Sequence, residues 1–135
     1  MTARRIMIVS GGTADEWMVD ALREHGFEVS AATTPLAYER LRLSPPDLLV
    51  IDVLDLREGI DLLKSVRAAP ELKPTLVMVI AEWGTGQPML ALSHGADAFE
   101  PKPVDEPRLL AAVKRLLRPN MVMVARANAL EVNED

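Results

Sequence analysis

Two ionisable residues lie where apolar runs end, and their types could support chemistry. Asp52 directly follows the uninterrupted apolar run of residues 48–51, and Lys102 closes the last short apolar segment before Pro103. A carboxylate at the end of a buried strand loses solvation energy unless a cation or hydrogen-bond donors meet it. We therefore expect Lys102 to be the counter-ion of Asp52.

The other candidate site residues also lie at the carboxyl ends of expected strands. Open parallel sheets collect ligands and reactive groups beyond these ends, near the switch in strand order. The rule selects Ser10, Gly11, Ile80, Ala81 and Phe99 as residues flanking the Asp52–Lys102 pair.

Short apolar runs separated by amphipathic segments must position these residues. Runs rich in β-branched residues and closed by glycine or a polar residue predict buried strands. The expected strands span residues 6–9, 27–31, 48–51, 76–80 and 98–100, the last broken by Pro101. Five helices are expected between and after them, with Thr13, Thr34 and Asp105 as N-caps and Gly26 and Gly95 as C-caps. Strands alternating with helices indicate an α/β fold with a five-stranded, doubly wound parallel sheet.

Composition limits the classes of function. The 135 residues have a formal net charge of −5, and no cysteine is present. Disulfides and thiolate chemistry are thereby excluded, and an acidic chain is a poor candidate for binding nucleic acid. The apolar runs are too short for a membrane span, so we expect a cytoplasmic protein. Residues 1–118 are expected to form the domain and 119–135 a C-terminal tail.

The order of elements, Asp52, the segment Gly95–Phe99 and the dipeptide Lys102-Pro103 resemble response-regulator receiver domains of the CheY-like family over residues 5–118. The resemblance implies the flavodoxin-like strand order 2-1-3-4-5, for which a chemotaxis receiver is a known example. It also implies that Asp52 matches the aspartate phosphorylated by a histidine kinase and Lys102 the lysine that pairs with the phosphoryl oxygens. Ala81 matches a small residue that leaves room for that group, and the Lys102-Pro103 peptide would be cis.

The sequence departs from this family at several site positions. Ser10-Gly11-Gly12 replaces the acidic pair that binds Mg²⁺ in the family, Ile80 replaces a switching Thr or Ser, and Phe99 matches the switching aromatic. The charges of Asp52 and Lys102 sum to zero, and Mg²⁺ binds mainly through carboxylates. We therefore expect neither a metal nor another cofactor. The sequence predicts a non-enzymatic pseudo-receiver that acts through protein contacts, with a kinase or a downstream regulator as partner.

Two other functions remain open. A conventional receiver would be phosphorylated on Asp52 with Mg²⁺, if Asp15, Glu16 or Asp55 rebuilt the metal site. A flavodoxin-like binder of a nucleotide or small ligand would use the turn at residues 10–13.

The tryptophans, the histidines and the tail carry weaker expectations. Trp17 is expected in the core, and Trp83 either contacts a partner or covers the pocket. His25 and His94 are expected at helix ends rather than as ligands. The last helix and residues 121–124 could form a homodimer.

Overall fold

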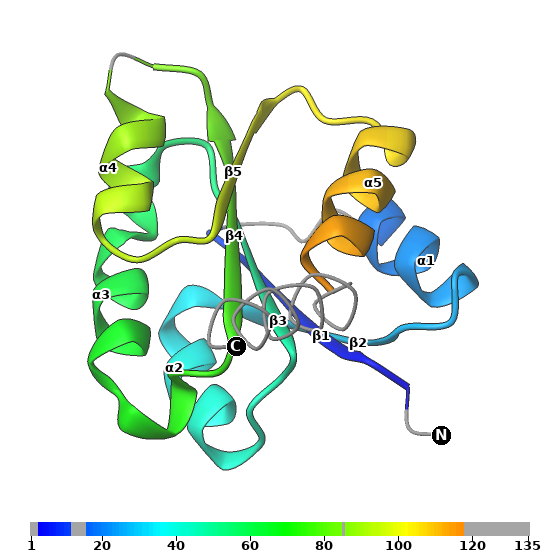
Figure 1. Ribbon diagram of the computed structural model, residues 1–135, viewed down its shortest axis with the longest axis horizontal. Coiled ribbons are helices and arrows are strands. Elements are labelled where there is room, and N and C mark those ends of the chain that lie inside the picture. The colour runs from blue at the N-terminus through cyan, green and yellow to red at the C-terminus, as the bar shows by residue number, and fades with distance from the viewer. Residues whose placement is uncertain (1–2, 12–15, 85, 118–135) are drawn as a thin grey trace, which may run out of the picture.

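A five-stranded parallel sheet forms the centre of the molecule (Figure 1). The computed structural model describes residues 3–11, 16–84 and 86–117. The strand order is β2-β1-β3-β4-β5, which confirms the predicted fold class and order. The strands are β1 (Arg5–Ser10), β2 (Glu28–Thr33), β3 (Leu48–Asp52), β4 (Leu76–Glu82) and β5 (Ala98–Lys102).

Helices cover both faces of the sheet. The helices α1 (Glu16–Glu24) and α5 (Glu106–Leu116) lie on one face, and α2 (Thr34–Leu43), α3 (Ile60–Ala68) and α4 (Gln87–Ser93) lie on the other (Figure 1). Two short 3₁₀ helices, η1 (Leu56–Glu58) and η2 (Pro70–Leu72), precede α3 and β4. Among the described residues, no helix is long and apolar enough to cross a membrane.

Alternate residues of each central strand pack into two separate hydrophobic cores, one on each face of the sheet. In β3, Leu48 and Val50 pack toward α1 and α5, whereas Leu49 and Ile51 pack toward α2 and α3. All four side chains are fully buried, as expected for a parallel sheet covered on both faces. By the same alternation, Asp52 belongs to the α1–α5 face of the sheet.

Several predicted caps are present. Asp105 caps α5 by accepting a hydrogen bond from the Arg108 amide at 3.0 Å. Gly26 and Gly95 have φ angles of +87° and +104° after α1 and α4. The cap of α2 was misplaced by one residue, because Thr33 holds the extended N-cap conformation and Thr34 already begins the helix. The expected cap at Thr13 lies outside the described residues, as do Gly12 and Asp15.

Two expectations about burial and strand length were wrong. Trp17 is exposed, at 38% of its maximum, while Met18, Ala21 and Leu22 form the buried side of α1. The strand β5 does not end at Pro101 but continues to Lys102. The reason is its position: in the described part of the chain β5 pairs only with β4, and an edge strand tolerates a residue without an amide hydrogen.

Arg67 of α3 joins the segments at the opposite end of the sheet from Asp52. Its guanidinium donates to the carbonyl oxygens of Gly95 and Thr75, each at 2.8 Å, and to the Asp97 carboxylate at 3.0 Å. That carboxylate also accepts from the Val77 amide at 2.8 Å. Arg67 therefore ties α3 to the starts of both β4 and β5.

Candidate functional site

Four residues form a lateral row at the carboxyl end of the sheet. Ser10 of β1 is in register with Asp52 of β3, Asp52 with Ile80 of β4, and Ile80 with Glu100 of β5. Partners in register on parallel strands project to the same face, which here is the one covered by α1 and α5. The alternation of buried strands thus places Asp52 between a small polar neighbour and a large apolar one.

Asp52 and Lys102 form an ion pair. Lys102 Nζ lies 2.9 Å from Asp52 Oδ1, and the Asp52 side chain is 3% exposed while that of Lys102 is 26% exposed. Lys102 is the last residue of β5, so its side chain crosses the end of β4 to reach β3. Charge-assisted contact of this kind offsets the solvation that a buried carboxylate loses. The sequence predicted this contact.

Two of the flanking residues predicted from the sequence, Ser10 and Ile80, lie beside Asp52 in the sheet, whereas Ala81 and Phe99 pack in the core on the other face of the sheet. Ile80 and Ala81 are fully buried, Ser10 is buried, and Phe99 is partly buried. The Lys102-Pro103 peptide bond is cis, as the resemblance implied. Ile80 occupies the space beside Asp52 with a hydrocarbon side chain, which has no hydroxyl group to donate.

The carboxylate of Glu58 lies against the loop that follows β1. A Cβ atom built on Gly11 would stand 2.7 Å from Glu58 Oε2. The other Glu58 oxygen accepts a hydrogen bond from the Asp55 amide at 3.3 Å, as part of a capping box at η1. The space that a side chain at residue 11 would enter is therefore already taken by an acidic group from the loop after β3.

The described residues do not supply the ligands that Mg²⁺ requires. Ser10 and Gly11 bring no carboxylate to the end of β1, the Asp52 carboxylate is paired with an ammonium, and Glu58 is engaged in the capping box. Within residues 3–11, 16–84 and 86–117, no three acidic, histidine or cysteine side chains are grouped as a metal site. Mg²⁺ favours several oxygen ligands in octahedral geometry. This donor set does not fit it.

Asp55 organises the loop between Asp52 and α3. Its carboxylate accepts hydrogen bonds from the Arg57 backbone amide at 2.9 Å and from the Arg57 guanidinium at 3.1 Å. The guanidinium bond, followed by the backbone bond, holds the pKa of the Asp55 carboxyl below its ordinary value. Asp55 is thus committed to its own loop and does not lie with Asp52 in a metal cluster.

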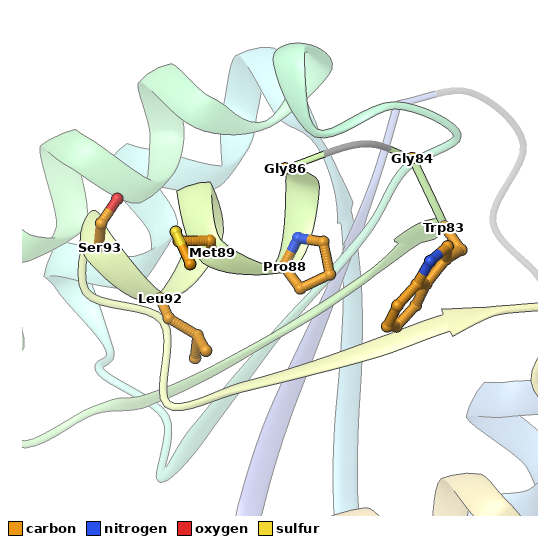
Figure 2. Close-up of a pocket in the computed structure, with 7 residues that line it drawn as sticks. All are labelled: Trp83, Gly84, Gly86, Pro88, Met89, Leu92 and Ser93. Carbon is orange, nitrogen blue, oxygen red and sulfur yellow. The ribbon is translucent and has the colours of Figure 1, made fainter.

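Trp83 lies at one end of an apolar groove along α4 (Figure 2). The Trp83 side chain is 70% exposed, and its ring meets Phe99 edge-on, with centroids 6.4 Å apart and planes at 70°. The groove has a volume of about 740 Å³, and Figure 2 shows Trp83 at one end and Leu92 and Ser93 of α4 toward the other. Its remaining lining comes from Gly84, Gly86, Pro88 and Met89.

Three residues near the site were missed by sequence reasoning. Glu58 and Gln87 contact the loops around Asp52, and Glu100 binds Arg108 and Arg115 of α5 at 3.0 and 3.6 Å. The spacing Asp55-x-x-Glu58 has the form of a capping box, and it could have indicated the role of Glu58. No comparable sequence pattern indicates the contacts of Gln87 or Glu100.

Known proteins with related sequences include a transcriptional regulatory protein and several response regulators. The chain is 35% identical over 100 residues to the phosphate regulon transcriptional regulatory protein PhoB of Rhizobium meliloti, covering 72% of this chain and 44% of that protein. It is 28% identical over 120 residues to the response regulator MprA of Mycobacterium ulcerans, covering 87% of this chain and 51% of that protein. The chain thus spans about half the length of these curated relatives. No family model matches the chain.

Solved structures with a similar fold include a signal receiver domain and a putative response regulator. A signal receiver domain of a histidine kinase from Syntrophus aciditrophicus has a TM-score of 0.77 and 29% identity, covering 87% of this chain and 92% of that one. A putative response regulator from Chloroflexus aurantiacus has a TM-score of 0.74 and 26% identity, covering 87% and 99%.

The fold and the strand-end pair define a doubly wound α/β domain with a buried aspartate at its carboxyl edge. Together with the comparisons, they place the chain in the response-regulator receiver (CheY-like) family of two-component signalling.

Proposed function

We propose that this receiver domain regulates a partner protein through surface contacts and that its phosphorylation on Asp52 is severely impaired. The observation that carries the proposal is the Asp52–Lys102 pair, 2.9 Å apart, beside a β1 end at which the described residues, Ser10 and Gly11, bring no carboxylate. A receiver of this kind is a signalling module rather than an enzyme. Its partners are a histidine kinase or a downstream regulator.

The electrostatics of the site support this proposal. Phosphoryl transfer develops charge that fixed cations must stabilise, and a bound metal ion supplies several kcal/mol of that stabilisation. Here Lys102 supplies one positive charge, which Asp52 already neutralises, and Glu58 adds a negative charge near Gly11. The sequence-based charge count omitted Glu58. Its carboxylate makes the edge less favourable still for a phosphate, which brings its own negative charge.

Intact-mass measurement with a small phosphodonor and Mg²⁺ tests the proposal directly. The attack of an Asp52 carboxylate oxygen on phosphorus would release the donor's leaving group and leave one phosphoryl group on the protein. We expect no such adduct on the wild-type chain under conditions that phosphorylate a conventional receiver assayed in parallel. An adduct that forms on the wild type and disappears in Asp52→Asn would establish the conventional receiver instead.

Ligand binding, dimerisation and the role of the tail stay predictions. Ligand binding at the turn of residues 10–13 depends partly on residues 12–13, outside the described part of the chain. The same holds for a homodimer through residues 121–124 and for a tail at 119–135. The 70% exposure of the Trp83 side chain, at one end of the groove along α4 (Figure 2), supports the partner-contact interpretation over the lid.

A further inference from the structure

The side chain of Gln87 joins the loop after Asp52 to the start of α4. Its carboxamide oxygen accepts a hydrogen bond from the Leu56 backbone amide at 3.2 Å. The Gln87 side chain also makes a small contribution to the lowered pKa of the Asp55 carboxyl. Asp55 and Leu56 begin the capped turn η1, three and four residues after Asp52. Gln87 is itself the first residue of α4. One side chain thus bridges segments that are 31 residues apart in sequence.

Gln87 is also packed tightly against the β4–α4 loop. A Cβ atom built on Gly84 would stand 2.9 Å from Gln87 Nε2. The backbone amide of Gln87 donates to the Gly84 carbonyl at 3.2 Å. Gly86, just before Gln87, has a φ angle of +79°, a conformation that glycine adopts without steric cost. The residues on either side of Gln87, among them Trp83 and Met89, line the apolar groove.

A backbone hydrogen bond and the Gln87 side chain both connect the loop after β3 to the segment after β4, with different consequences for α4. The Glu82 amide donates to the Leu54 carbonyl at 2.9 Å, but this bond lies before Gly84 and Gly86, where the backbone is least restricted. The Gln87 side chain spans that glycine-containing segment and holds the helix itself. A displacement of Leu56 therefore acts on α4 through Gln87 more directly than through the backbone.

We propose that Gln87 is a positioning residue that couples the loop following Asp52 to the apolar groove along α4. Ile80 has no hydroxyl group with which the end of β4 could sense a change at Asp52, and it is fully buried. The loop of residues 53–58 offers the alternative route, since the Gln87 side chain accepts a hydrogen bond from the Leu56 amide of that loop. The coupling goes beyond the proposed function, because it operates whether the loop is moved by a phosphoryl group or by a partner.

Amide hydrogen exchange tests the first half of the coupling. In Gln87→Ala the Leu56 amide loses its acceptor, and we expect it to exchange about three- to tenfold faster, the range set by one ordinary hydrogen bond. Gln87→Glu keeps an oxygen acceptor and should largely retain the protection. Ser93→Ala, which changes α4 at a hydroxyl that donates to the nearby Leu90 carbonyl, is the matched control. Unchanged Leu56 exchange in Gln87→Ala overturns the proposal.

Fluorescence of Trp83 tests the second half. In a Trp17→Phe background, Trp83 is the only tryptophan of the chain, so its emission and acrylamide quenching report on the groove. Glu58→Ala removes one bond of the η1 capping box, and Arg57→Ala loosens the same loop by removing an exposed side chain that binds Asp55. We expect both changes to shift the Trp83 signal when Gln87 is present and to leave it unchanged in Gln87→Ala. An equal shift with and without Gln87, or no shift in either background, overturns the coupling.

Discussion

The ammonium nitrogen of Lys102 lies 2.9 Å from Oδ1 of Asp52 and so joins the edge strand β5 to the central strand β3 across β4. The carboxylate is almost fully buried, whereas the lysine remains partly solvated. Removal of a buried charge's partner leaves an uncompensated ion, which is far more destabilising than the net worth of the pair. Because loss of one partner costs more than the pair contributes, substitution of Lys102 is a sensitive test of whether the pair forms.

Lys102→Ala should lower the free energy of unfolding by about 3 kcal/mol, the lower end of the range for breaking buried pairs, because Lys102 keeps some solvent contact. Urea denaturation at neutral pH measures the change. The double variant Lys102→Ala/Asp52→Asn should recover most of the loss, since it also removes the buried charge. Lys114→Ala, at an exposed position of α5, serves as the control. A Lys102→Ala variant as stable as that control would show that the pair is solvated in solution.

Gly11→Asp should give the strand-end site a Mg²⁺ response that the wild type lacks. The new carboxylate would stand beside Glu58 and face the end of β3, where additional oxygen ligands favour a divalent cation. Without metal, the variant should be less stable by about 0.5–2 kcal/mol, because the crowded Glu58 gives up its capping contact. Millimolar Mg²⁺ should then raise its melting temperature through preferential binding to the folded state. Gly11→Ala separates crowding from charge, and a wild-type chain that Mg²⁺ stabilises equally would contradict the charge argument.

Arg67→Ala should destabilise the protein by about 2–4 kcal/mol, since several charge-assisted hydrogen bonds to carbonyl and carboxylate oxygens are lost together. Arg67→Lys should recover only a fraction, because a single ammonium cannot reach the Gly95, Thr75 and Asp97 oxygens at once. Chemical denaturation compares both with Lys64→Ala, an exposed residue of the same helix. Equal stability of the lysine variant and the wild type would refute the multidentate role.

The Asp55 carboxyl should titrate below 3.8, its ordinary value, because Arg57 stabilises the charged form. A folded-state pKa below the unfolded one contributes stability that is fully present above pH 3.8 and is lost as the pH falls through the lowered value. Arg57→Ala should shift the pKa of Asp55 upward toward 3.8. Carboxyl chemical shifts followed by NMR give both values, and high salt should reduce the difference between them. Identical titration curves at low salt would show that the ion pair does not form.

Local patterns in the sequence determined where the elements lie. Apolar runs closed by polar residues located the five strands, Asp105 marked the start of α5, and Gly26 and Gly95 marked the helix ends with positive φ angles. These signals depend on neighbours a few residues away, so they can be read without the fold. The Asp52–Lys102 contact was also predictable, because a buried carboxylate requires a cation and strand ends converge on one edge.

Only the tertiary structure decided which side chains contact the loops near the Asp52–Lys102 pair. Trp17 was expected in the core, yet it lies at the margin of the α1 buried face, and only the packing of neighbouring elements sets that margin. Pro101 fits within β5 because β5 is an edge strand, a property of the sheet rather than of the segment. Glu58 lies against Gly11, and Gln87 at the start of α4 binds Leu56; these segments meet only through the packing of the helices on the sheet. Such contacts join residues distant in the chain, and no periodic pattern encodes them, because a polar loop side chain finds its hydrogen-bond partner only once the folded backbone presents one.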